Sequence, residues 1–334
     1  MSSHTLTEAK SPPATHTLPG RDLVSVGDLS PIELESLFAL AGQLKARPQD
    51  FRQALAGRHV AMFFEKPSLR TRITFEAGIC GLGGTVSFLD QRHERLDARE
   101  TLSDVAHNLE RWVSAIVLRT FAHETVQDMA ELAGVPVINA LSEVEHPCQA
   151  LADYFTLQER FKNLRKITLA YVGDGNNVMH SLLLAAALLG SKIRTATPEG
   201  YGASPGILAD AVAIAKKTGG EIEVLTDPAR AVRGVDAVYT DAWTSMGHEN
   251  ETGERDAVFP PYQVNDALMA KAAPHAVFMH CLPAHRNQEV TDAVIDSVQS
   301  VVFDQAENRM HVQKAVLMML AGENRGRPIR SAHA

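Results

Sequence analysis

The chain has 334 residues, of which 45% are hydrophobic and 22% charged, the usual balance of a soluble globular protein. Its net charge of -8 argues against a general binder of nucleic acids or membrane surfaces, so an anionic ligand would need a local basic cluster. The length exceeds the usual size of one domain, and we expect two domains that share a cleft.

The first 20 residues are rich in Ser, Thr and Pro and lack the apolar segment of a secretory signal, which predicts a flexible tail. The longest apolar run, residues 182–190, is too short to span a membrane. Three widely spaced cysteines without a CxxC pair are a poor disulfide framework and indicate a reducing compartment: Cys80, Cys148 and Cys281. We expect a cytoplasmic protein.

From about residue 57 onward, short β-branched or aromatic runs alternate with helical stretches of ten or more residues. This alternation predicts parallel sheets covered by helices. The expected strands form two series: residues 58–64, 85–89, 114–119 and 135–139, then 166–172, 191–196, 221–225, 236–240, 276–280 and 300–304.

Residues 146–161 predict a long helix between the two series, and residues 305–322 a final helix that packs back on the first domain. The expected fold is α/β, with two doubly wound parallel-sheet domains joined by long helices and an active-site cleft between them. The predicted limits are a tail at 1–20, a first domain at 21–150 plus 305–334, and a second domain at 151–304.

Chemically rich segments directly follow six of the predicted strands. In open parallel sheets, ligands bind outside the carboxyl ends of the strands, so the six segments are expected to line one cleft. They read EKPSLRTR, RTFAH, NALSEVEHPCQ, GDGNN, TDAWTSMGHE and HCLPAHR.

In EKPSLRTR, Pro67 and the N-cap residue Ser68 predict a helix that begins at Leu69. The free N–H groups of its first turn favour an anion, to which Ser68 and Thr71 add hydroxyls and Arg70 a bidentate guanidinium. The alternative is a capped surface helix with solvated arginines.

Other side chains in these segments extend the hypothesis of an anion site. Arg119 ends a buried strand, where a charge usually has an anionic partner. His146 and Gln149 share one helix face and could bind a carbonyl and an amide, or could serve as a cap and a packing residue. Arg72 has its own expected partner, Glu76, one helical turn further on.

GDGNN resembles the start of a dinucleotide-binding loop, but Val178 stands where that pattern needs Gly or Ala. Its two Asn side chains could bind the polar ends of an amino acid or could form the turn. TDAWTSMGHE opens a loop predicted to run to about residue 261, typical of a lid. There Asp241 could pair with an ammonium group, while Trp243 and Met246 are available for burial.

HCLPAHR offers two His and one Cys, but no second CxxC or HxxxH pair completes a zinc site, so we expect no metal. Cys281 could be an acyl-forming nucleophile with His280 or His285 as its base. A thiol that only contacts substrate fits equally well.

Together these motifs resemble those of the aspartate/ornithine carbamoyltransferase family. SLRTR is similar to its S-T-R-T-R motif and HPCQALAD to its H-P-x-Q motif. DAWTSMG and HCLPAHR resemble the ornithine-specific D-x-x-x-S-M-G and H-C-L-P motifs, and ENRMHVQKA (307–315) resembles the family's final helix. The resemblance runs from about residue 21 to 322. It implies that the first domain binds carbamoyl phosphate, that the second binds ornithine, and that the chain forms homotrimers or multiples of trimers.

The resemblance implies transfer of the carbamoyl group of carbamoyl phosphate to the δ-amine of L-ornithine, giving L-citrulline and phosphate without a cofactor or metal. Arg119, His146 and Cys281 would be the catalytic residues. The implied carbamoyl phosphate-binding residues are Ser68, Leu69, Arg70, Thr71, Arg119, His146, Gln149, Cys281, Leu282 and Arg309. The implied ornithine-binding residues are Asn177, Asp241, Ser245 and Met246.

Two positions depart from the family pattern. Leu69 replaces a Thr, a small loss if that position contributes mainly its backbone N–H, and Asp97 replaces a Gly. Asp97 lies in a loop that tends to approach a neighbouring subunit's site, and Arg95 is the candidate contact there. Rival hypotheses are a carbamoyltransferase for N-acetylornithine or putrescine, a dinucleotide-dependent oxidoreductase, and a catalytically silent binding protein.

Overall fold

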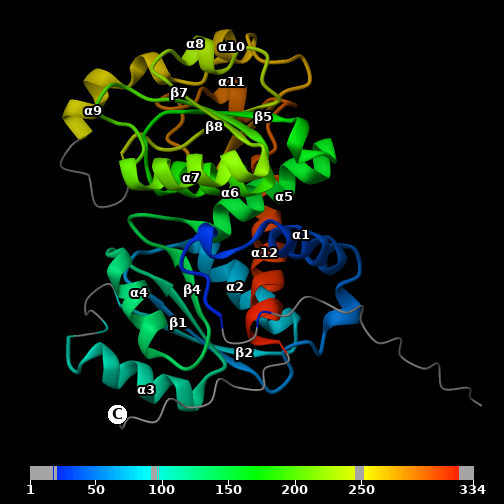
Figure 1. The fold of residues 1–334 in the computed structure, drawn as a ribbon, viewed down its shortest axis with the longest axis vertical. Coiled ribbons are helices and arrows are strands. Elements are labelled where there is room, and N and C mark those ends of the chain that lie inside the picture. The colour runs from blue at the N-terminus through cyan, green and yellow to red at the C-terminus, as the bar shows by residue number, and fades with distance from the viewer. Residues whose placement is uncertain (1–17, 19–20, 92–95, 97, 245–251, 323–334) are drawn as a thin grey trace, which may run out of the picture.

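The computed structural model describes residues 18, 21–91, 96, 98–244 and 252–322, and these form two α/β domains one above the other in Figure 1. The first contains a four-stranded parallel sheet in the order β2-β1-β3-β4. The second contains a five-stranded parallel sheet in the order β7-β6-β5-β8-β9. The prediction of two doubly wound parallel-sheet domains is confirmed.

The strands lie close to their predicted positions, because each is a short run of apolar, often β-branched residues that the sheet buries. In the first sheet they are β1 (His59–Phe64), β2 (Thr85–Asp90), β3 (Ala115–Arg119) and β4 (Val137–Leu141). In the second they are β5 (Thr168–Val172), β6 (Lys192–Ala196), β7 (Glu221–Leu225), β8 (Ala237–Thr240) and β9 (Val277–His280).

Helices cover both faces of the sheets, and α5 and α12 lie at the boundary between the domains (Figure 1). In the first domain and at its boundary they are α1 (Pro31–Ala46), α2 (Leu69–Gly81), α3 (Leu102–Trp112), α4 (His123–Leu132) and α5 (Pro147–Phe161). The second series is α6 (Asn177–Leu189), α7 (Pro205–Thr218), α8 (Pro228–Ala231), α9 (Thr252–Val258), α10 (Asp266–Met269), α11 (Asp292–Ile295) and α12 (Val302–Ala321).

Two local predictions are wrong. Residues 300–304 do not form a strand: Ser300 makes only an isolated bridge to Phe278, and α12 already begins at Val302. The β propensity of this run is overridden because Val302 is buried as part of a 20-residue helix, while Phe303 is 73% exposed. The predicted loop to about residue 261 is also interrupted, since Thr252–Val258 forms α9.

The helix α12 packs against α5, α1 and α2, and the red helix crosses the boundary between the domains in Figure 1. Polar side chains join it to α5: the Asn308 amide donates to Thr156 Oγ1 at 3.0 Å and to Glu159 at 2.7 Å. Lys45 on α1 donates to Asn308 Oδ1 at 2.8 Å. These contacts place α12 against the first domain, and the exact domain limits stay a prediction.

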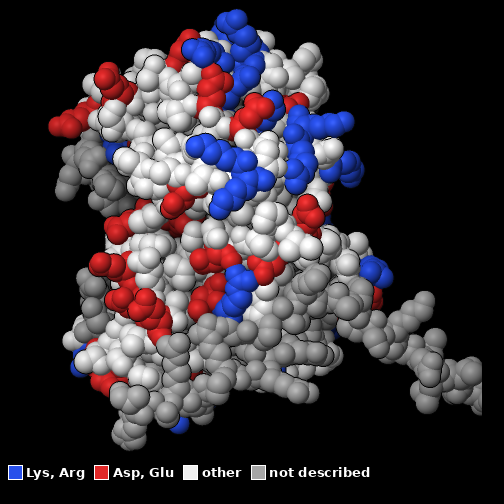
Figure 2. All heavy atoms as spheres, viewed as in Figure 1, with Lys and Arg blue, Asp and Glu red and all other residues white. Residues whose placement is uncertain are grey.

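Among the described residues, no helix has both the length and the apolar character needed to cross a bilayer. Figure 2 shows Lys, Arg, Asp and Glu side chains distributed over both domains on the face that it draws. Most of the Lys and Arg side chains drawn on this face lie over the second domain, with Asp and Glu side chains among them.

Candidate active site

A cavity of about 320 Å³ lies where the carboxyl ends of the strands of both sheets meet. This position is the one expected for a ligand site in open parallel sheets, and the volume is in the usual range for small-molecule pockets. Eleven of the predicted site residues line it: Ser68, Leu69, Arg70, Arg119, His146, Gln149, Asn177, Asp241, Cys281, Leu282 and Arg309. Ser245, Met246 and Arg95, like Asp97, lie outside the described residues.

The helix α2 begins as predicted, with Ser68 as its N-cap. The Ser68 hydroxyl oxygen accepts from Thr71 N at 3.2 Å, so the backbone N–H groups of Leu69 and Arg70 remain available to a ligand. The Leu69 side chain is 75% exposed. Its departure from the Thr of the family motif therefore leaves the backbone donor unchanged. Arg72 is turned away, pairing with Glu76 at 3.0 Å as predicted.

Three guanidinium groups, those of Arg70, Arg119 and Arg309, face the cavity from α2, the end of β3 and α12. Within the described part of the chain, none of them forms an ion pair with a carboxylate. Burial, together with Arg309 and Arg70, lowers the pKa of Arg119 to about 9. A cluster of like charges that mutually disfavour their charged forms is stabilised by an anion, which is the physical basis for an anion site here.

Thr71 does not line the cavity but acts on one of these groups. It is fully buried, and its hydroxyl accepts from the Arg309 guanidinium, which lies 238 residues away in the sequence. The first turn of α2 and the middle of α12 are thereby joined. The contact fixes the orientation of Arg309 toward the cavity.

His146 is the N-cap residue of α5, and Gln149 follows one turn later, so both side chains reach the cavity. Burial and the neighbouring Arg309 and Arg119 hold the pKa of His146 well below its usual range, so the imidazole is neutral near pH 7. In the part of the chain that the structure describes, His146 Nδ1 and Gln149 Oε1 are both buried without a hydrogen-bond partner. Unsatisfied buried polar atoms that face a cavity indicate a polar ligand.

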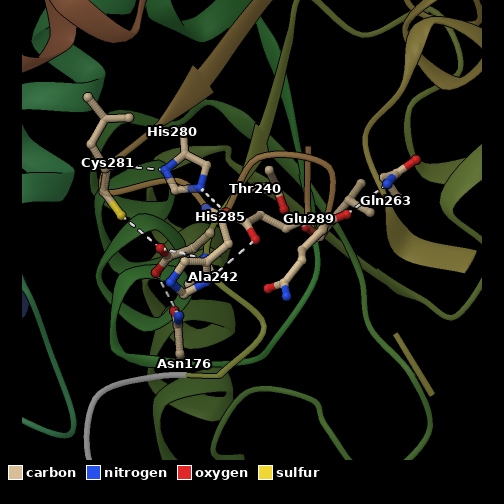
Figure 3. Close-up of polar contacts among 12 residues, drawn as sticks. Asn176, Thr240, Ala242, Gln263, His280, Cys281, His285 and Glu289 are labelled. Carbon is tan, nitrogen blue, oxygen red and sulfur yellow. Dashed lines mark hydrogen bonds and ion pairs between the residues drawn. The ribbon is translucent and has the colours of Figure 1, made fainter. Parts of the chain in front are cut away.

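Near the cavity, His280 and Cys281 are neighbours in sequence but differ in their contacts (Figure 3). His280 is fully engaged, since its Nδ1 accepts from Leu282 N at 2.9 Å and its Nε2 contacts Glu289 at 3.2 Å. The Cys281 thiol donates to Asp241 at 2.9 Å. Burial and Asp241 raise the pKa of Cys281 well above its usual value, so the thiol stays protonated. A protonated thiol is a poor nucleophile, which favours the contact role over an acyl-enzyme.

Of the two Asn side chains of GDGNN, one forms the turn and the other lines the cavity. Asn176 forms the turn: its side-chain oxygen caps α6, while its amide donates to Asp241 at 2.8 Å (Figure 3). Asn177 lines the cavity and donates to Ser142 O at 2.6 Å. The turn needs glycine at position 175, because a Cβ there would lie 2.3 Å from the carbonyl carbon of Gly202.

Sequence reasoning missed several residues of the site. Lys66 lines the cavity but was given no role, although it lies inside a motif that was singled out. His285 also lines the cavity, and it was considered only as a base for Cys281. Asp153 binds Gln149 from one turn further along α5, a spacing that could have been read from the sequence. Gln305 reaches Asp153 from α12 across 152 residues, and no local signal marks it.

Glu145, next to His146, is buried with an ionisable carboxyl group. Its Oε2 accepts from Val26 N at 3.1 Å and from Ser181 Oγ at 3.0 Å, while Ser181 Oγ in turn accepts from His146 N at 2.9 Å. Burial raises the pKa of Glu145 to about 7, from 4.5. The folded chain therefore holds this proton more tightly than the unfolded chain does.

A glutamate whose pKa is raised by folding makes the protein less stable as pH rises from about 4.5 to about 7. We expect Glu145→Gln to remove this dependence and to stabilise the protein at pH 8 by up to roughly 3 kcal/mol, at about 1.4 kcal/mol per pKa unit. The measurement is urea unfolding of wild type and variant at pH 5 and pH 8. Equal pH dependence in both proteins would contradict the assignment.

Fold and site together are those of a two-domain α/β enzyme with a cleft lined by arginine side chains between its domains. The carbamoyl-P binding domain of aspartate/ornithine carbamoyltransferases matches residues 21–159, and the Asp/Orn binding domain matches residues 165–320. The chain belongs to the aspartate/ornithine carbamoyltransferase family, a family of carbamoyltransferase enzymes.

Individual relatives are similar over nearly their whole length. The ornithine carbamoyltransferase of Shewanella oneidensis is 50% identical over 90% of this chain and 99% of its own. The anabolic ornithine carbamoyltransferase of Pyrococcus furiosus is 46% identical over 92% of this chain and 98% of its own. A solved structure of ornithine carbamoyltransferase from Pyrococcus furiosus superposes with a TM-score of 0.89 at 46% identity, covering 92% of this chain and 99% of that one.

Proposed function

We propose that this enzyme transfers the carbamoyl group of carbamoyl phosphate to the δ-amine of L-ornithine and releases L-citrulline and phosphate. The observation that carries the proposal is a cluster of three guanidinium groups beside a neutral imidazole in the cavity between the two domains. Among the described residues, none of the three forms an ion pair with a carboxylate. The relatives named ornithine carbamoyltransferase support the same reaction. The anabolic relative favours its use in arginine synthesis.

Phosphate would bind at the start of α2. The N–H groups of Leu69 and Arg70 point out of the helix there, and the helix dipole favours an anion at this end. Ser68 would add its hydroxyl group to this site, whereas Thr71, which does not line the cavity, would act through Arg309. Arg70 would add a bidentate contact, which a planar guanidinium makes to phosphate better than an ammonium group does.

The carbamoyl group would lie between Arg119, His146 and Gln149, with Arg309 and the segment Cys281–Leu282 closing over it. The neutral δ-amine nitrogen attacks the carbonyl carbon, and negative charge develops on the carbonyl oxygen. The bond to the phosphate oxygen then breaks, and the proton lost by the attacking nitrogen leaves with the phosphate. Donors fixed near that oxygen stabilise the transition state more than the ground state. Bringing the two substrates together in one cleft supplies a further part of the rate enhancement.

Ornithine would be held from the second domain by Asn177, Asp241, Ser245 and Met246. The carboxylate of Asp241 is positioned by the Asn176 amide and the Cys281 thiol, so that it faces the cavity as a partner for an ammonium group. Residues 21–150 with 305–334 would form the carbamoyl phosphate domain and residues 151–304 the ornithine domain.

The proposal also includes the location, the oligomeric state and the partners of the enzyme. It would act in the cytoplasm as a homotrimer or a multiple of trimers, with Arg95 approaching the site of a neighbouring subunit. It would require no cofactor or metal and have no nucleic-acid or membrane partner. The mixed charges of the face in Figure 2 support that last point.

Substrate choice is tested by measuring carbamoylated product from carbamoyl phosphate with L-ornithine, N-acetylornithine or putrescine. We expect L-ornithine to be preferred by at least about 100-fold in kcat/KM, because the site is built to pair with a free amino acid. Turnover of N-acetylornithine or putrescine without turnover of L-ornithine would contradict the proposal.

A further inference from the structure

Gln149 presents one end of its amide to the cavity and the other to a buried carboxylate. Its Nε2 donates to Asp153 Oδ1 at 2.8 Å, one turn along α5. Gln149 lines the cavity, and its Oε1 is buried without a hydrogen-bond partner among the described residues. An acceptor left in this state favours a ligand that can donate to it over one that cannot, by a factor of about 10 to 100.

The orientation of that amide is fixed by hydrogen bonds that begin in the other domain. The backbone N–H of His280, at the end of β9, donates to Gln305 Oε1 at 3.1 Å. A backbone N–H can only donate, so the nitrogen of Gln305 must point the other way. It donates to Asp153 Oδ1 at 2.6 Å and to the Tyr239 hydroxyl at 3.2 Å.

Asp153 therefore receives two amide donors on one oxygen, and an ionised carboxylate can only accept. Gln149 has no choice but to face it with nitrogen and to face the cavity with oxygen. All three side chains are at most 1% exposed, so water does not compete for these bonds. We call Gln149, Asp153 and Gln305 the amide relay.

We propose that Asp153 and Gln305 are positioning residues which hold the carbonyl oxygen of Gln149 toward the cavity, so that the site selects an acyl phosphate bearing an NH₂ group over one bearing a methyl group. This inference rests on the proposed function, because it explains how a carbamoyltransferase would refuse an acetyl phosphate of the same shape. The amide of the correct substrate donates to Gln149 Oε1. A methyl group would leave that oxygen unsatisfied.

Two stable phosphonates that differ only in this group test the inference without turnover: phosphonoacetamide, which carries NH₂, and acetonylphosphonate, which carries CH₃. Burial raises the pKa of Asp153 to about 7. Binding is therefore measured by calorimetry at pH 8, where Asp153 is ionised. We expect the wild type to bind the amide at least about 10-fold more tightly than the ketone. In Asp153→Leu, which removes the acceptor, this ratio should fall toward 1.

Asp153→Asn is the matched control. Its amide oxygen can still accept from both Gln149 and Gln305, so the ratio should stay within about threefold of the wild type. An Asp153→Leu variant that keeps the wild-type ratio of affinities overturns the inference. This holds also if the variant binds both probes more weakly by the same factor, because that result would indicate a merely structural role. If Asp153→Asn no longer prefers the amide probe, the preference depends on the charge of Asp153 and not on its hydrogen bonds. That result would likewise overturn the inference.

If Asp153→Leu does not fold, Gln305→Met decides the question, because it breaks the amide relay at its origin and retains side-chain length. We expect its ratio to fall at least about threefold, and an unchanged ratio overturns the inference. Citrulline formation by the wild type is measured in parallel. A wild type that discriminates between the probes but forms no citrulline overturns the proposed reaction and leaves the amide relay supported.

Discussion

Arg70→Ala should reduce citrulline formation at least about 100-fold while leaving the fold intact, roughly the effect of losing one positioned charge in a closed site. Arg70 is the half-buried guanidinium at the start of α2, beside the free N–H groups proposed to hold phosphate. Steady-state citrulline assays at saturating ornithine measure the loss. Near-normal turnover would count heavily against the phosphate site.

Stability measurements separate this loss from unfolding. Burial lowers the pKa of Arg70, and Arg70 in turn lowers the pKa of Arg119, so removing it relieves repulsion in the ligand-free protein. The melting temperature without ligand should therefore not fall. Added inorganic phosphate should raise the melting temperature of the wild type more than that of the variant, because ligand that binds only the folded state stabilises it.

Arg47→Ala is the matched control for this experiment. Arg47 pairs with Asp50 at 3.7 Å on the surface, with side chains 59% and 55% exposed. Exposed pairs of this kind contribute about 0–1 kcal/mol. We expect turnover and the effect of phosphate to match the wild type. A comparable loss in Arg47→Ala would show that the Arg70 result reflects general charge removal.

Arg255→Leu should destabilise the protein by about 3–5 kcal/mol, the usual effect of removing one partner of a buried ion pair. Arg255 pairs with Asp174 at 2.9 Å, with side chains 8% and 9% exposed, and donates to Trp243 O at 2.6 Å. It also lies near the rings of Tyr201 and Phe259, at 5.1 and 5.7 Å. Urea unfolding measures the change.

The same variant should raise the KM for ornithine more than the KM for carbamoyl phosphate. The reason is that Arg255 holds the backbone of Trp243, two residues after Asp241. Arg230→Leu is the control, since its pair with Glu223 at 2.9 Å is exposed. We expect a change of at most about 1 kcal/mol there. An Arg255→Leu protein as stable as Arg230→Leu would contradict the role of the buried pair.

Features that depend on neighbours in the sequence could be predicted. The alternation of apolar runs and helical stretches was enough to predict the two parallel sheets. Ser68 caps α2, and Arg72 pairs with Glu76, because both interactions span no more than four residues. The cleft followed from a general property of parallel sheets, that segments after the strands meet at one edge. The motifs within those segments pointed to the family.

Features that depend on burial and on distant partners required the tertiary structure. Residues 300–304 have strand propensity, yet Val302 and the two residues after it form the first turn of α12, a 20-residue helix that packs against α5, α1 and α2. The same sequence left Cys281 open as a nucleophile, and only its desolvation beside Asp241 shows a protonated thiol. Thr71 meets Arg309 and Gln305 meets Asp153 across 238 and 152 residues. Local sequence patterns determine the helices and strands and the side chains available for chemistry. Desolvation and long-range hydrogen bonds determine how each side chain is used, and the sequence alone does not show them because both arise only when the chain is packed.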